Sequence, residues 1–195
     1  MTPSLTIVVV CALVIIIALV GYSMAWLLLI SAADRLTERL LALQPGMNVI
    51  DVGCGSGRLT TALAKRVGPT GSVLGIDMKA GKVQRAEQRA QAASIKNLRF
   101  ERAGAGEGKL PPHHFDRAVL SAVLGEMPHR EAALAEIFQT LKPTGMLSVT
   151  EGFLDPHHQS QEQVRHLVHA VGFVEENCVG NRWLFTMNLL KPPTS

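Results

Sequence analysis

The sequence predicts an α/β protein, in which helices cover a mostly parallel sheet, preceded by one membrane-spanning helix. Three observations support this prediction. A buried strand pattern at residues 49–52 runs into a glycine-rich turn and then a helix. Strand and helix patterns alternate from there onward, which is typical of right-handed βαβ units. Finally, residues 5–30 form an apolar run that contains no charged side chain.

This uncharged run is long enough to cross a bilayer. As a helix it would cover ~39 Å, against about 30 Å of hydrocarbon core. A cleaved signal peptide is the alternative, but it normally has a basic start and a shorter apolar core, and residues 1–4 contain no Lys or Arg. A buried soluble helix would need apolar neighbours on every face. Arg35 and Arg39 follow the run, so the positive-inside rule predicts a single-pass membrane protein with its C-terminal side in the cytoplasm.

The segment after the run is predicted to be an amphipathic connecting helix over residues 32–44. It contains no Gly or Pro, and Leu36 and Leu40 recur at helical spacing. We therefore expect a transmembrane anchor at residues 1–31 and a globular domain at residues 45–191. Because no flexible linker separates them, we expect the active site to lie close to the bilayer surface.

The turn after the first strand indicates the kind of ligand. It reads D-x-G-x-G-x-G, with Asp51 followed by Gly53, Gly55 and Gly57. A dinucleotide fingerprint, G-x-G-x-x-G, would need glycine at position 58, which is Arg58. Glycines carry no Cβ, so a ligand can approach the backbone closely. The carboxylate of Asp51 suits a cationic group better than a pyrophosphate.

A second acid ends the next predicted strand. Residues 72–77 read as a strand that finishes at Asp77. An acid in that place can accept hydrogen bonds from ribose hydroxyls. A ribose, a cationic amine and no phosphate together describe S-adenosylmethionine (SAM). A glycine-rich turn beside a solvated Asp77 is the structural alternative, and an NAD-dependent enzyme is the chemical one.

At these residues the chain resembles the class I SAM-dependent methyltransferases, especially the ubiquinone/menaquinone-biosynthesis branch. The resemblance covers about residues 43–191. It rests on residues 49–57, 73–77 and 115–120, on the motif L-G-E-M-P at 124–128, and on residues 136–145 with their phrase L-K-P-x-G. It implies a Rossmann-like, seven-stranded, mostly parallel sheet with an antiparallel hairpin at its C-terminal edge, near residues 173–178 and 182–190.

The resemblance also implies a set of cofactor-binding residues: Asp51, Gly53, Gly55, Gly57, Asp77, Met78 and Ser121. Asp51 would hold the ammonium of SAM, and Asp77 the ribose hydroxyls. Met78 would lie on the adenine face. Many relatives carry an acid after the third strand that meets the adenine amino group, but this chain reads A-G-A-G before Glu107. Adenine would therefore rely on backbone groups or on Glu107.

Methyl transfer from a sulfonium depends mainly on positioning and desolvation, because the donor is already activated. A general base is needed only for a hydroxyl or an acidic carbon acceptor. The predicted candidates are Glu126, Glu151 and His157, with His129 and His158 as further candidates. All five follow the fourth or the fifth strand. A surface or capping role is the alternative for each.

The anchor and the tight junction favour a hydrophobic acceptor from the bilayer, such as a quinone precursor or another lipid. A small soluble or xenobiotic nucleophile is one alternative, and a non-catalytic SAM-binding membrane module is another. Nucleic acid is not an expected partner, because the net charge is only +3 and aromatic content is 5%. His166 and His169 lack a Cys or carboxylate cluster that would complete a metal site, so no metal is predicted. The oligomeric state is not indicated.

Overall fold

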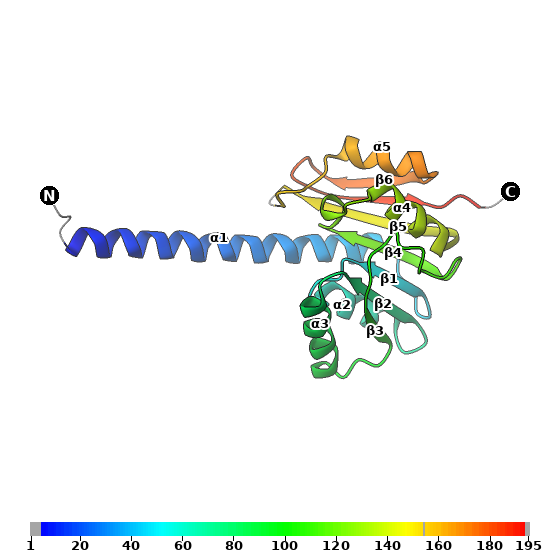
Figure 1. The fold of residues 1–195 in the computed structure, drawn as a ribbon, viewed down its shortest axis with the longest axis horizontal. Helices are drawn as coiled ribbons and strands as arrows, with labels where there is room; N and C mark the ends of the chain where they lie inside the picture. Colours follow the sequence, from blue (N-terminus) through cyan, green and yellow to red (C-terminus); the bar gives the residue numbers. More distant parts are fainter. Residues whose placement is uncertain (1–4, 154, 194–195) are drawn as a thin grey trace. The chain divides into compact units, whose positions relative to one another are not determined.

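The computed structural model describes residues 5–153 and 155–193 and separates the chain into two compact units, Met1–Ala32 and Ala33–Ser195 (Figure 1). Helix α1 (Leu5–Leu40) fills most of the first unit and ends in the second. Within the first unit, Ile7–Ala25 is long and apolar enough to span a membrane. Length and composition alone support this assignment, and a signal sequence would meet the same criteria.

The second unit is built on a seven-stranded sheet of order β3-β2-β1-β4-β5-β7-β6. The strands are β1 (Asn48–Val52), β2 (Ser72–Asp77), β3 (Leu98–Arg102), β4 (Phe115–Ser121), β5 (Leu141–Gly152), β6 (Val174–Gly180) and β7 (Leu184–Leu190). The helices are α2 (Arg58–Val67), α3 (Ala80–Ala92), the 3-10 turn η1 (Leu124–Glu126), α4 (Arg130–Thr140) and α5 (Gln161–Val171). Pairs among the first five strands are parallel, whereas β7 is antiparallel to β5 and β6. The predicted fold class is confirmed.

Three details of the sheet go beyond the sequence prediction. The last strand, β7, lies between β5 and β6, so the edge of the sheet is the first strand of the hairpin. Strand β5 begins at Leu141 because Leu141 pairs with Phe115 of β4 ahead of a register shift. The short turn η1 was not predicted. It follows β4 at the carboxyl ends of the parallel strands.

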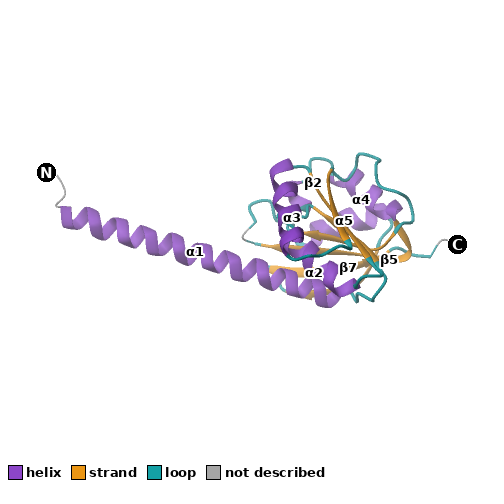
Figure 2. Cartoon of the chain, turned by 90° about the horizontal axis from the view of Figure 1, so that it is seen from below, coloured by secondary structure: helices purple, strands orange, loops and turns teal. Residues whose placement is uncertain are grey.

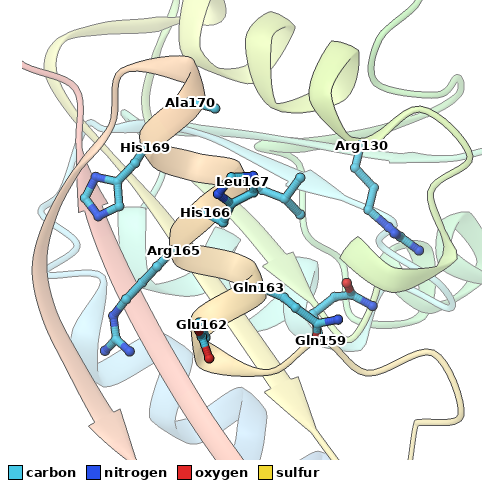
Figure 3. A pocket seen from close by; sticks show the side chains of 9 residues that line it. All are labelled: Arg130, Gln159, Glu162, Gln163, Arg165, His166, Leu167, His169 and Ala170. Carbon is cyan, nitrogen blue, oxygen red and sulfur yellow. The ribbon is translucent and has the colours of Figure 1, made fainter.

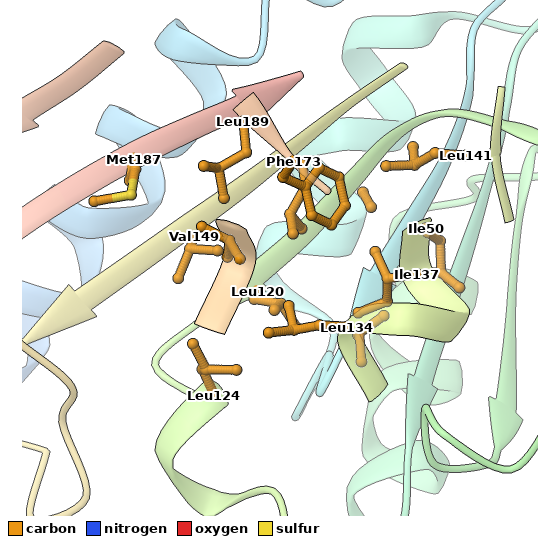
Figure 4. Packing of buried hydrophobic residues seen from close by; sticks show 14 of the residues in the cluster. Ile50, Leu120, Leu124, Leu134, Ile137, Leu141, Val149, Phe173, Met187 and Leu189 are labelled. Carbon is orange, nitrogen blue, oxygen red and sulfur yellow. The ribbon is translucent and has the colours of Figure 1, made fainter. Parts of the chain in front are cut away.

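Helices cover both faces of the sheet, as Figure 2 shows in purple against the orange strands. Successive side chains along β1 point to opposite faces of the sheet, so they show which hydrophobic cluster lies on which face. Val49 belongs to a cluster with Leu59 and Leu63 of α2, whereas Ile50 belongs to the larger cluster on the opposite face. That larger cluster contains Leu134, Ile137, Val164, Val168 and Phe173 from α4, α5 and the residue that precedes β6 (Figure 4). Burial of each such side chain contributes about 1.5–3 kcal/mol.

The C-terminal end of α1, which belongs to the second unit, contacts the sheet through buried hydroxyls. Thr37 Oγ1 lies 2.6 Å from Thr150 Oγ1 of β5, which lies 2.8 Å from Thr186 Oγ1 of β7. All three side chains are buried. Leu36 and Leu40 are only half-buried, so this contact is more polar than the leucine spacing predicted.

Side chains of the sheet also satisfy the last carbonyl groups of α1. Asn188 Nδ2 donates to Leu40 O at 2.9 Å, and Arg117 Nε donates to Leu41 O at 2.8 Å. Helix ends leave such carbonyls without intrahelical partners, and these bonds supply them. The last turns of α1 are therefore part of the folded sheet unit rather than a separate linker.

We predict that Thr150→Val destabilises the second unit by about 1–3 kcal/mol, because the change preserves shape but removes the hydroxyl that Thr37 and Thr186 share. Urea unfolding of the full chain in detergent measures this. Thr150→Ser keeps the hydroxyl and is expected to lose less. A valine variant as stable as the serine variant would contradict the role of this hydroxyl chain.

Candidate active site

A cavity of about 320 Å³ opens where β1, β2 and β4 end. Its walls come from the turns after those strands, the loop after β3, and η1. The lining residues are Val52, Gly53, Asp77, Met78, Lys79, Lys82, Ala103, Gly104, Ala105, Gly106, Glu107, Ala122, Val123, Glu126, Met127, Pro128 and His129. Ligands of open parallel sheets bind at this edge, beyond the carboxyl ends of the strands.

The three glycines after β1 all take left-handed backbone angles, with φ of 75°, 55° and 74° at Gly53, Gly55 and Gly57. A Cβ on Gly53 would come within 2.3 Å of Val123 Cγ2, and one on Gly57 within 2.8 Å of Ala86 Cβ. A Cβ on Gly55 would meet nothing within 4 Å. The outer two glycines therefore permit close packing, while the middle one faces open space.

Asp77 connects the glycine turn to the end of β2. Its Oδ2 accepts a hydrogen bond from the Gly55 amide at 3.1 Å, and its Oδ1 accepts one from the Lys79 amide at 2.8 Å. The side chain is almost fully buried yet borders the cavity. Met78, the next residue, is exposed and also lines the cavity. Both predicted residues therefore lie at the site.

Asp51 lies in the sheet beside the start of α2. It is buried, and its Oδ2 accepts a hydrogen bond from Thr60 Oγ1 at 2.6 Å. Burial raises the pKa of Asp51 to about 7, the Thr60 hydrogen bond opposes this rise, and the charges of Asp34 and Asp77 add to it. The sequence pattern gave no sign of Thr60, because its role depends on how α2 packs against β1.

The loop after β3 is held from two sides. Glu136 of α4 accepts hydrogen bonds from the Leu110 amide at 2.9 Å and from the Gly106 amide. Glu107 accepts one from the Gly104 amide at 3.3 Å. Glu107 and Met78 both line the cavity, and a Cβ on Gly104 would lie within 3.5 Å of atoms of both. Glu136 fixes this wall from a helix interior, a role that the sequence pattern did not suggest.

The three predicted bases occupy different environments. Glu126 lines the cavity, with its Oε2 3.6 Å from Lys79 Nζ. Glu151 is buried at the end of β5, where Oε2 accepts from the Gln159 amide at 3.1 Å and Oε1 has no partner among the described residues. Burial raises the pKa of Glu151 to about 7. His157 is exposed. Neither Glu151 nor His157 lines the cavity.

The loop after β5 packs tightly on η1. A Cβ on Gly125 would lie 1.7 Å from the carbonyl oxygen of His157, so the close approach requires glycine. Arg130 holds the same turn, because its Nε and Nη2 donate to the carbonyls of Leu124 and Gly125 at 3.1 and 2.8 Å. The sequence analysis recognised Gly125 only as part of a motif and missed Arg130.

A second, open groove contains the histidines of α5. Arg130, Gln159, His166 and His169 are among its lining residues (Figure 3). Within the part of the chain that the structure describes, no group of three His, Cys, Asp or Glu side chains is placed to share a metal ion. None of the predicted site residues lines this groove.

The structure thus brings together part of the predicted site. Gly53, Asp77, Met78 and Glu126 line the cavity, whereas Asp51, Gly55, Gly57, Ser121, Glu151 and His157 do not. Ala122 and Val123, which were expected beside the sulfonium together with Ser121, line the cavity. Lys79 and Lys82 also line the cavity. Lys79 directly follows Asp77 and Met78, and Lys82 lies in the first turn of α3.

Comparison with known proteins supports these observations. The family described as a methyltransferase domain matches residues 43–185. The ubiquinone/menaquinone biosynthesis C-methyltransferase UbiE of Ectopseudomonas mendocina is 34% identical over 118 residues, which are 60% of this chain and 46% of that protein. A demethylmenaquinone methyltransferase of Listeria welshimeri is 30% identical over 112 residues, 57% of this chain and 48% of that protein. The chain therefore spans about half the length of these relatives.

Solved structures share the fold. A SAM-dependent methyltransferase from Aquifex aeolicus has a TM-score of 0.74 at 21% identity, and covers 80% of this chain and 88% of its own. The [4+2]-cyclase SpnF also has a TM-score of 0.74, at 20% identity, and covers 85% of this chain and 81% of its own. At these identities the likeness shows the fold alone.

We predict that Asp51→Asn stabilises the ligand-free chain by a few kcal/mol above pH 7 and has no such effect below about pH 4. The raised pKa of Asp51 means that the folded state holds a proton which the unfolded state releases, so stability is lost as pH rises from the ordinary value of 3.8 through about 7. Thermal unfolding across this pH range measures the difference.

The matched control for this pH series is Glu101→Gln, which changes an exposed acid on β3. Its stability difference is expected to be small across the range. An asparagine variant that loses stability above pH 7 would contradict the cost of ionising Asp51 inside the sheet.

Proposed function

The chain belongs to the methyltransferase-domain family, whose match covers residues 43–185, and from this we propose that it transfers a methyl group from SAM to a hydrophobic acceptor. SAM is the cofactor that this family membership implies. The observation that carries the proposal is the Asp77 carboxylate, which borders a cavity at the carboxyl ends of the strands beside the backbone of Gly53. The match to the named relatives spans about half of their length, so the activity of this chain is a proposal.

The residues around the cavity fit SAM. Asp77 is an acid at the end of β2, where ribose hydroxyls can donate to it. Met78 and the loop that carries Glu107 offer a surface for adenine. Asp51 is buried and does not line the cavity, but a cation placed near it would favour its ionised form, which suits the proposed ammonium. Lys79 and Lys82 give the cavity positive charge, which suits the carboxylate of an amino acid.

When bound, SAM supplies a methyl group that its sulfonium has already activated. The protein must hold the acceptor in line with that methyl group and exclude water from the site. Val123 and Met127 contribute apolar wall to the cavity. We assign Glu126 as the group that takes a proton from an acidic acceptor, because it lines the cavity. His129, the other candidate base that lines the cavity, is the N-cap residue of α4. For Glu151 and His157, the role of general base stays a prediction.

The proposed acceptor is a quinone-like or other lipid-like molecule. The names of the two relatives state that they methylate ubiquinone or menaquinone precursors, and one of them acts on carbon. The helix over Ile7–Ala25 is proposed as a single membrane anchor for such a substrate. Arg35 and Arg39 follow it, which supports a cytoplasmic catalytic unit. Methylation of a small soluble nucleophile is the alternative within the same reaction class.

A second candidate function is SAM binding without methyl transfer. The [4+2]-cyclase SpnF has the same fold, so this fold does not by itself determine the reaction. Such a chain would bind SAM at the Asp77 cavity but produce no methylated acceptor.

To separate these functions, we would supply SAM with a radiolabelled methyl group to the full chain in membranes that contain quinone precursors. We expect label in the organic extract, because the acceptor is lipid-soluble. Label in a water-soluble product would favour the soluble nucleophile, and SAM binding without label in either phase would favour the non-catalytic function. Glu126→Gln should lower the labelling rate by about 10²–10⁴-fold if the acceptor must lose a proton.

We predict that Asp77→Ala weakens SAM binding at least tenfold, because each lost hydrogen bond between a ribose hydroxyl and a charged group is worth about 1.5–3 kcal/mol. Calorimetric titration of SAM into the full chain measures this. Asp77→Asn keeps one acceptor oxygen for the Gly55 amide and separates loss of the ligand contact from loss of the turn. Glu101→Ala on neighbouring β3 is the control, and unchanged affinity in Asp77→Ala would refute the ribose assignment.

A further inference from the structure

Two aromatic rings lie exposed beside each other next to β5. Phe153 directly follows β5, and Trp183 directly precedes β7. Their ring centroids are 5.1 Å apart in an edge-on arrangement, and the residues are 45% and 50% exposed. The guanidinium of Arg182 lies 4.5 Å from the centre of the Trp183 ring. We refer to Phe153, Arg182 and Trp183 as the aromatic patch.

Hydrogen bonds connect the backbone segments that carry the aromatic patch. Asn181 Oδ1 accepts hydrogen bonds from the amides of Trp183 and Leu184 at 2.8 and 3.2 Å, which shapes the turn between β6 and β7. The Phe153 amide donates to the Trp183 carbonyl at 2.7 Å, so the two segments are joined. The rings are therefore held in place while much of their apolar surface stays in water, and folding gains nothing from that exposed part.

The aromatic patch and the candidate active site lie at the same end of the sheet, where the parallel strands have their carboxyl ends. Strand β5 is parallel to β4 and ends at Gly152, which pairs with Leu184. Phe153 therefore continues β5 beyond the carboxyl ends of the parallel strands, the edge at which the cavity opens. A substrate that reaches the cavity must approach from this edge.

The polypeptide also enters the second unit at this edge. Thr37 contacts Thr150 and Thr186, and the Leu40 carbonyl, one helical turn later, contacts Asn188 further along β7. Going back along the helix from Leu40 through Thr37 therefore leads toward the start of β7 and the end of β5. Within the second unit, which begins at Ala33, α1 therefore runs from the side of the aromatic patch toward Leu40.

We propose that the aromatic patch docks on the bilayer surface, with Trp183 and Phe153 at the headgroup level and Arg182 on anionic lipid phosphates. Trp and Phe suit this interface because their rings are apolar and Trp keeps a polar N–H. Arg pairs with phosphate through several N–H donors. This inference rests on the proposed function, because docking would place the open edge of the sheet against the source of a lipid-like acceptor.

A bilayer fits the small size of the aromatic patch better than a soluble protein does. A stable protein–protein interface buries about 1,200–2,000 Å² in total, far more than three side chains provide. A tethered chain needs much less, because a membrane anchor raises the effective concentration of the second contact. The proposed anchor over Ile7–Ala25 is part of the same chain.

The test measures the depth of Trp183 by quenching with brominated lipids. The chain has two tryptophans, so Trp26→Phe leaves Trp183 alone. The full chain is placed in phosphatidylcholine vesicles with and without phosphatidylglycerol. We expect lipids brominated near the headgroup to quench most of the Trp183 emission, with a blue-shifted maximum. Arg182→Gln should reduce the quenching only in vesicles that contain phosphatidylglycerol.

The matched control moves the reporter to the far end of the β6–β7 hairpin. Val174 is 52% exposed and pairs with Leu190, at the opposite end from Trp183. The variant Trp26→Phe/Trp183→Phe/Val174→Trp should show little quenching in the same vesicles. Equal quenching at positions 174 and 183 would overturn the docking proposal.

Measurement of methyl transfer in the same vesicles tests the docking proposal and the proposed function separately. Labelled lipid product together with unquenched Trp183 would refute docking and leave the proposed function intact. Quenched Trp183 without SAM binding would refute the proposed function and leave docking intact. If both hold, Phe153→Ser/Trp183→Ser should slow methylation of a lipid acceptor several-fold while SAM affinity stays unchanged.

Discussion

The hydrogen bonds of the Asp77 carboxylate are the interaction on which the candidate site depends. One oxygen accepts a hydrogen bond from the Gly55 amide and the other accepts one from the Lys79 amide. A single side chain therefore fixes two turns at the carboxyl ends of the strands. The left-handed angles of the glycine turn make this geometry accessible. Because the same carboxylate borders the cavity, the group that shapes the backbone is also available to a ligand.

Buried acids give this edge of the sheet its electrostatic character. Asp51 and Glu151 lie at the ends of different strands, and burial raises the pKa of each to about 7. Ionisation of either inside the sheet costs stability, and one oxygen of Glu151 has no partner in the described part of the chain. Neither group lines the cavity. A cationic ligand near Asp51 would offset the cost, which is consistent with the proposed SAM ammonium.

A polar contact holds the end of α1 on the sheet within the second unit. Thr37, Thr150 and Thr186 form a buried line of hydroxyls, and the carbonyls of Leu40 and Leu41 find donors on the sheet. Buried hydroxyls are costly when unpaired, so this arrangement specifies one position for the helix end on the sheet. An apolar contact of the same area would restrain the helix less strictly.

The sequence by itself determined the fold class, most of the helices and strands, and the central ligand motif. Those features are encoded in short stretches: the glycine turn after residue 52, the acid at Asp77 and the alternation of strand and helix. Only the tertiary structure decided that β7 lies inside the hairpin edge, that Thr60 binds Asp51, and that Glu126 rather than Glu151 lines the cavity. These facts depend on strand order and register, which bring together residues far apart in the chain, whereas periodicity and turn chemistry report only on near neighbours.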